Sequence, residues 1–129
     1  MKKIVLLCLT ALLLNVTNGI AQVSKAPAYP LITLNPYFSI WSFSDLLNES
    51  TTKHWTGAPN SMLGLIKVDG KVYRFLGNED TLKNLSIEPA QQVALDMNAT
   101  QTLYTFTCGT IQLNVSFTSP LIITDLSIP

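Results

Sequence analysis

The stretch TLYTFTCGTIQLNVSFT, residues 102–118, decides the fold of this chain. Its second half alternates polar residues with four apolar ones, namely Ile111, Leu113, Val115 and Phe117. Its first half alternates in the same way through Tyr104, Phe106 and Cys108, and Gly109 follows where a turn is needed. A period of two residues is that of a β-strand with one face buried, and a slip of one residue would turn the apolar row to water. The stretch therefore predicts two antiparallel strands with one dry face and one wet face.

The rest of the chain continues this β pattern. Asp69-Gly70 separates two apolar runs and suits a two-residue hairpin, because both central positions of a type I′ turn need a positive φ. Further short strands are predicted at residues 31–34, 37–43, 84–88 and 91–97. The fold class predicted is all-β, an antiparallel β-sandwich or meander. Residues 121–129 begin another apolar strand without a closing element, so we expect an incomplete framework that is the front part of a longer protein.

The first 21 residues have the pattern of a secretory signal peptide. Met1-Lys2-Lys3 is a basic start, and the apolar run from Ile4 to Val16 is too short for a comfortable membrane span. Small residues then precede a cleavage position ahead of Gln22. We therefore expect a periplasmic or secreted protein with no membrane attachment after cleavage of the signal peptide, residues 1–21.

Composition narrows the class of protein further. The 129 residues have room for one ordinary domain, and 47% hydrophobic against 12% charged residues favours a packed core. Loss of Lys2 and Lys3 with the signal peptide leaves six basic and eight acidic side chains and no basic run, which argues against nucleic-acid binding. Cys108 is then the one remaining cysteine, and we expect it to be a buried free thiol.

The segment Asn35–Gly57 departs from the regular pattern and gathers both tryptophans and the only histidine. We expect residues 44–60 to form a long polar loop, with a helical turn near residues 45–49. Indole faces, an imidazole and a carboxylate suit a sugar or an amide, which gives four tentative ligand-binding residues: Trp41, Asp45, His54 and Trp55. The alternative for each residue is structural. The tryptophans would fill the core, His54 would make a structural hydrogen bond, and Asp45 would hold a turn or cap a helix.

No catalytic residue, metal site or cofactor is predicted for this chain. Cys108 and His54 would be the only thiol and imidazole of the mature chain, and nothing in their spacing brings them together. One histidine and one thiol without clustered carboxylates are a poor ligand set for a metal ion. The sequence also lacks the Gly-x-Ser-x-Gly, phosphate-loop and dinucleotide-binding glycine patterns.

Several blocks of the sequence resemble the amino-terminal region of the secreted glutaminase A family of the Bacteroidetes type. The blocks are Pro30-Leu31, NPYFSIW at 35–41, HWTG at 54–57, KVDGKVYRFLG at 67–77 and FTSPL at 117–121. Their order and spacing cover most of the mature chain, and together they are more specific than any one block alone.

The resemblance implies a modular exported hydrolase that converts L-glutamine to L-glutamate and ammonia. Residues 22–80 would be a short N-terminal domain, and residues 81–129 would begin a β-sandwich domain, truncated before an α/α-toroid catalytic domain. The chain would then be a non-catalytic N-terminal module whose partner is the downstream catalytic domain of the same polypeptide. The alternative is a β-module of a periplasmic glycoside-hydrolase-like protein that binds a carbohydrate or peptide, with a glycan or small-molecule amide as its ligand.

Overall fold

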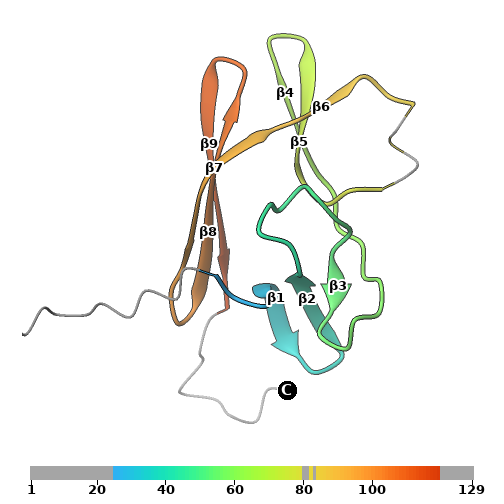
Figure 1. Ribbon diagram of the computed structural model, residues 1–129, viewed down its shortest axis with the longest axis vertical. Coiled ribbons are helices and arrows are strands. Elements are labelled where there is room, and N and C mark those ends of the chain that lie inside the picture. Colours follow the sequence, from blue (N-terminus) through green and yellow to red (C-terminus); the bar gives the residue numbers. More distant parts are fainter. Residues whose placement is uncertain (1–24, 80–81, 83, 120–129) are drawn as a thin grey trace, which may run out of the picture.

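The computed structural model describes residues 25–79, 82 and 84–119. Within these ranges the chain forms strands and turns without an α-helix, which confirms the all-β prediction. The strands lie in three sheets of three strands each (Figure 1). The expected signal peptide and the expected strand at residues 121–129 lie outside the described residues. The strands are β1 (Tyr29–Asn35), β2 (Phe38–Ser42), β3 (Lys53–His54), β4 (Gly64–Val68), β5 (Lys71–Leu76), β6 (Ile87–Pro89), β7 (Gln91–Met97), β8 (Gln101–Cys108) and β9 (Ile111–Thr118).

The alternating stretch at residues 102–118 forms β8 and β9, which with β7 make an antiparallel meander. The two strands pair in one continuous register from Gln101↔Thr118 to Cys108↔Ile111. One face of β8 is dry, because its alternate side chains are at most 1% exposed: Thr102, Tyr104, Phe106 and Cys108. On β9, the apolar residues Leu113, Val115 and Phe117 are half-buried, and Ile111 is exposed. The apolar face of β9 is therefore less buried than that of β8.

The β4–β5 hairpin has the predicted turn. Asp69 and Gly70 have φ values of 48° and 83°, and both positive values are what a type I′ turn requires. This turn leaves the strands on either side in antiparallel pairing from Val68↔Lys71 toward Gly64↔Leu76.

One strand pair differs from the antiparallel prediction. β6 runs parallel to β5, with Val72 opposite Ile87 and Arg74 opposite Pro89. A parallel pair needs a crossover, and the chain between β5 and β6 provides it instead of a tight turn. β6 lies at the edge of its sheet, where Pro89 can be accommodated although it has no backbone N–H to donate.

The long loop predicted at residues 44–60 is partly wrong. Lys53 and His54 form the short strand β3, which pairs with β2 through Trp41↔Lys53 and Ile40↔His54. The helical turn expected near residues 45–49 is also wrong, because this region consists of bends and hydrogen-bonded turns. Long-range hydrogen bonds from Leu47 and Asn48 to other segments determine the conformation of these turns.

A single hydrophobic core is shared by all three sheets. The first sheet contributes Leu31 and Ile40, the second Tyr73 and Leu76, and the third Tyr104, Phe106 and Cys108. Leu47 and Ala90 complete the core from outside the strands. In Figure 1 the teal-green chain after β2 lies beside the β7-β8-β9 sheet. In this part of the loop Leu47 and Asn48 are buried, whereas Leu46 and Glu49 are exposed.

Candidate functional site

The structure divides the four predicted ligand-binding residues among three places. His54 and Trp55 lie together beside the β1–β2 turn, with ring centroids 5.4 Å apart. Trp41 lines a hollow between the first and third sheets. Asp45 belongs to a polar network at the start of the chain's described part. The structure therefore contains no single site made of all four residues.

The polar atoms of His54 and Trp55 are both directed to the backbone of the β1–β2 turn. His54 Nε2 lies 2.9 Å from the carbonyl oxygen of Pro36, and Trp55 Nε1 donates to the same oxygen at 3.0 Å. Because a carbonyl oxygen only accepts hydrogen bonds, Nε2 must carry the imidazole proton. Nδ1 is then free to accept from Thr56, whose backbone N lies 3.3 Å away and whose Oγ1 lies 2.9 Å away. His54 thus makes the structural hydrogen bond that was one of its two interpretations.

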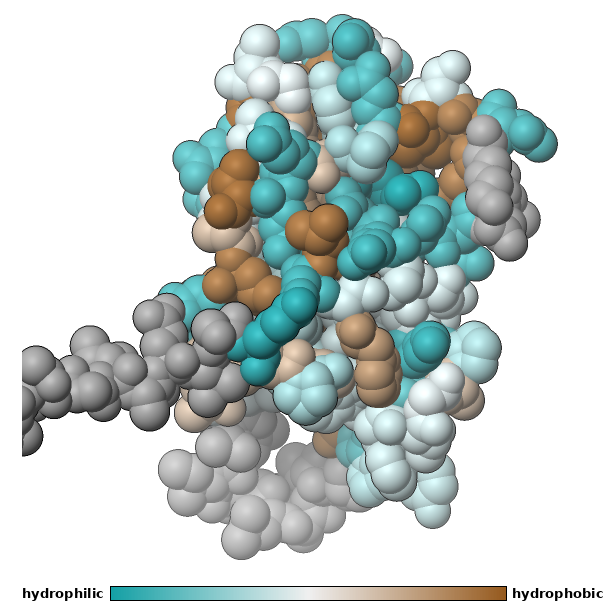
Figure 2. Space-filling model, in the orientation of Figure 1, coloured by the Kyte–Doolittle hydropathy of each residue, from teal (hydrophilic) through white to brown (hydrophobic). Residues whose placement is uncertain are grey.

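The rings around this turn are open to solvent. Tyr37 is 94% exposed, Trp55 56% and Phe38 46%. We call these three residues and His54 the aromatic surface. Trp55 therefore does not fill the core, and its indole face is available for contact. Elsewhere, the face shown in Figure 2 carries its brown apolar side chains in separate small patches among polar ones.

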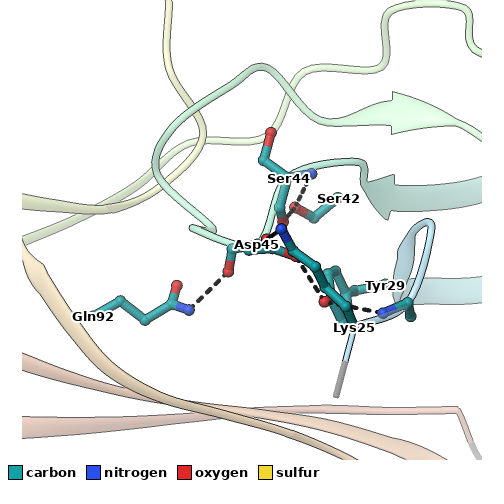
Figure 3. A network of polar contacts seen from close by, with 7 residues as sticks. Lys25, Tyr29, Ser42, Ser44, Asp45 and Gln92 are labelled. Carbon is teal, nitrogen blue, oxygen red and sulfur yellow. Dashed lines mark hydrogen bonds and ion pairs between the residues drawn. The ribbon is translucent and has the colours of Figure 1, made fainter. Parts of the chain in front are cut away.

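Asp45 is held by two donors, Lys25 from the lead-in to β1 and Tyr29 from the first position of β1 (Figure 3). Lys25 Nζ forms an ion pair with Oδ2, and the Tyr29 hydroxyl donates to Oδ1 at 2.9 Å. These hydrogen bonds lower the pKa of the Asp45 carboxyl below its ordinary value of 3.8. Both carboxylate oxygens are engaged, so Asp45 has a structural role, but it joins two distant segments and does not hold a turn or cap a helix as its structural interpretation had it.

We expect the substitution Asp45→Asn to lower stability at neutral pH and to have no such effect in acid. A carboxyl whose pKa is lower in the folded state stabilises the fold above its unfolded pKa. That contribution is lost as the pH falls below the ordinary value of 3.8 toward the folded value. Urea unfolding between pH 7 and pH 2 checks this. The difference between wild type and variant should shrink below about pH 4.

The matched control for this prediction is Asp96→Asn, which changes an exposed carboxylate on β7. This variant removes a carboxylate outside the network of Lys25, Tyr29 and Asp45, so it should not reproduce the loss of stability at neutral pH. A difference between Asp45→Asn and wild type that persisted undiminished to pH 2 would contradict the role given to the carboxylate.

Residues 44–52, here called the bridging segment, hold the three sheets together through side-chain amides. Asn48 is buried and donates from Nδ2 to the carbonyl oxygens of Arg74 at 3.0 Å and Ala90 at 2.8 Å. Gln92 accepts from the backbone N of Leu47 at 2.9 Å and donates to the carbonyl oxygen of Asp45 at 2.8 Å. Both amides bond to backbone groups of other segments, as buried polar groups require. The Arg74 carbonyl oxygen also accepts from the backbone N of Ala90 at 2.9 Å.

Trp41 contributes to a hollow of about 210 Å³ between β1, β2 and the β7–β8 turn. Its Nε1 donates to Ser39 Oγ at 2.7 Å, so the indole nitrogen is already paired. Phe117 of β9 also lines the hollow, as do Asn98 and Thr100 of the β7–β8 turn. Trp41 is half-buried and is absent from the central core, which leaves its ring accessible from this hollow.

The described residues offer little material for covalent or metal chemistry. Cys108 is buried on β8, as predicted, and burial raises the pKa of its thiol, which keeps it protonated. Within the described ranges, His, Cys, Asp and Glu side chains form no group of three that could hold a metal ion. The same ranges contain no helix long and apolar enough to cross a membrane.

Comparison with known proteins places the chain in a family without assigning it an activity. The family described as a domain of unknown function, DUF4964, matches residues 4–88, and because this match covers more than half of the chain, the protein belongs to that family. The match includes the aromatic surface and the bridging segment and ends within β6. No curated protein matches the chain, and no solved structure does so.

Proposed function

We propose that this chain is the non-catalytic N-terminal module of an exported glutaminase-like hydrolase. In this proposal the aromatic surface packs against the downstream catalytic domain of the same polypeptide. The hydrolysis of glutamine to glutamate and ammonia would be carried out by that domain, and the module would support it. The blocks of sequence that resemble the glutaminase A family support the hydrolase class and the exported location.

One observation carries the role given to the aromatic surface. The polar atoms of His54 and Trp55 are paired with the Pro36 carbonyl and Thr56, while the rings of Tyr37 and Trp55 are exposed. A histidine that acts as a base needs a free nitrogen beside a substrate proton. Exposed aromatic rings, in contrast, are typical anchors of protein interfaces, where they fill pockets on the partner. The arrangement therefore favours contact over chemistry.

Cys108 supports the same conclusion for nucleophilic catalysis. A thiol nucleophile must be a thiolate within hydrogen-bonding reach of a base. Cys108 is fully buried on β8, and burial raises the pKa of its thiol, which keeps it protonated. His54 belongs to β3, and its two ring nitrogens are bonded to Thr56 and to the Pro36 carbonyl oxygen. We therefore assign amide hydrolysis to the downstream domain and not to these two residues.

The proposal is tested by Tyr37→Ala, because this side chain is almost fully exposed in the chain described here. The variant is made in this chain and in the product of the complete gene, and the free energy of unfolding is measured in both. We expect no loss of stability in the isolated chain and a clear loss in the longer protein, where the ring would be buried at the contact.

The matched control is Val93→Ala, which removes an exposed apolar side chain from β7, away from the aromatic surface. It should behave alike in both proteins. A coding sequence that stops after Pro129 would contradict the proposal, as would release of ammonia from glutamine by this chain in a manner that depends on His54.

A further inference from the structure

The hollow beside Trp41 combines one apolar wall with an uncharged polar rim. Trp41 and Phe117 form the apolar part, on β2 and β9 respectively. Two lining residues, here called the rim, carry side-chain amides: Asn98 in the β7–β8 turn and Gln101 at the start of β8. The described residues that line the hollow include neither an acid nor a base. Its volume of about 210 Å³ is smaller than that of ordinary drug-sized pockets and suits a single small ring.

Internal hydrogen bonds determine what each lining residue can offer a ligand. The indole nitrogen of Trp41 is paired with Ser39, so Trp41 presents only its apolar ring. Gln101 Nε2 donates to Thr118 Oγ1 at 3.2 Å, which orients the amide and keeps its carbonyl oxygen as an acceptor. Asn98 is exposed and offers both an acceptor and donors. Thr33 and Ser119 also line the hollow, and their hydroxyls lie 2.6 Å apart and bond to each other.

We propose that this hollow binds one neutral pyranose ring of a glycan, with its apolar C–H face against Trp41 and its hydroxyls on the amides of Asn98 and Gln101. A sugar ring has an apolar face and a polar edge, and a wall of aromatic carbon beside uncharged amides complements both. A free amino acid such as glutamine carries an ammonium and a carboxylate, and each would have to be desolvated without a partner of opposite charge. The absence of charge among the described lining residues therefore favours the sugar.

The site is distinct from the aromatic surface, and the inference does not depend on the proposed hydrolase. None of the four residues of the aromatic surface lines the hollow, whose lining includes residues 98–100 of the β7–β8 turn. Trp55 thus serves as an internal reference, since the chain has two tryptophans and only Trp41 lines the hollow.

The test is a titration of the chain with methyl β-D-glucopyranoside, methyl α-D-mannopyranoside and N-acetylglucosamine, followed through the two indole N–H resonances. These resonances are assigned with Trp55→Phe. We expect at least one of these sugars to shift the Trp41 resonance in a saturable manner while the Trp55 resonance stays in place. L-glutamine at the same concentrations should leave both resonances unchanged.

Two rim variants and one control decide whether the response comes from this hollow. Asn98→Ala and Gln101→Ala should each weaken the sugar affinity about five-fold, the effect of one lost hydrogen bond. Asn114→Ala, which changes an exposed asparagine on β9 that does not line the hollow, should leave the affinity unchanged. The proposal is overturned if none of the three sugars gives a saturable shift, if glutamine alone binds, or if both rim variants bind as wild type does.

Discussion

Replacing Phe106 by alanine is expected to cause a large loss of stability, seen as unfolding at a much lower urea concentration. Phe106 has no exposed surface, and its ring packs 6.0 Å from that of Phe75 and 6.2 Å from that of Tyr104. Removing a buried phenylalanine side chain destabilises a protein by about 3–5 kcal/mol, through lost burial and the cavity left behind. Small domains have a total stability of only about 5–15 kcal/mol, so this one substitution would remove a substantial part of it.

Urea unfolding followed by circular dichroism measures this effect, with Phe43→Ala as the matched control. Phe43 is 41% exposed, and its ring lies 5.8 Å from Lys53 Nζ at the surface. We expect the control to lose about 1 kcal/mol or less, the ordinary effect of a surface substitution with a weak cation–π contact. Equal transition midpoints for the two variants would contradict the position of the shared core.

Gly77→Ala is expected to cause a loss of stability second to that of Phe106→Ala among the substitutions considered. Gly77 has a φ of 71°, and an added Cβ would overlap the carbonyl oxygen of Met62. The left-handed backbone alone costs a non-glycine residue about 1–2 kcal/mol, and overpacking adds about 1–3 kcal/mol. The backbone N of Gly77 also donates to Leu47 of the bridging segment at 3.0 Å, so a shift there would loosen the link between sheets.

Gly70→Ala separates the two contributions. Gly70 has a similar φ of 83°, but an added Cβ would meet nothing within 4 Å. This variant should lose only the backbone contribution of about 1–2 kcal/mol, whereas Gly77→Ala should lose about twice as much or more. Thermal unfolding of the two variants measures the difference. If Gly70→Ala were the more destabilised of the pair, the close approach of Met62 to Gly77 would be wrong.

The regular strands were predictable because their signals are local. The alternation at residues 102–118 fixed both β8 and β9, and Asp69-Gly70 fixed the β4–β5 turn. In each case neighbouring residues contain the whole signal, either as a period of two or as a pair that tolerates positive φ.

The bridging segment and β6 were not predictable in the same way, because long-range contacts decide them. Asn48 resembles any polar loop residue in sequence, yet it is buried and binds two carbonyl groups, one on β5 and one at Ala90. The Gln92 side chain bonds to the backbone of Leu47 and Asp45, which lie 45 and 47 residues before it in the sequence. The parallel pairing of β6 likewise depends on which strand the chain reaches after β5. The sequence of a three-residue strand does not indicate its pairing partner or direction.

The candidate site was predicted in composition but not in geometry. The aromatic residues of the segment Asn35–Gly57 do not form one site. Trp41 lines the hollow, whereas His54 and Trp55 both bond to the Pro36 carbonyl oxygen at the β1–β2 turn. Asp45 bonds to Lys25 and Tyr29, which lie 16 or more residues before it, so the residues next to Asp45 do not indicate these contacts. Exposure of Tyr37 and Trp55 could not be read from residue type, since aromatic residues serve equally well in cores.

In our proposal the exposed ring of Tyr37 is a contact for a further domain of the same polypeptide. The most direct test of this claim is the change in unfolding free energy caused by Tyr37→Ala in this chain and in the complete gene product. We predict a change within about 0.5 kcal/mol in the isolated chain and a loss of about 2 kcal/mol or more in the longer protein. The same small change in both proteins would contradict the claim, because the ring would then remain in solvent throughout.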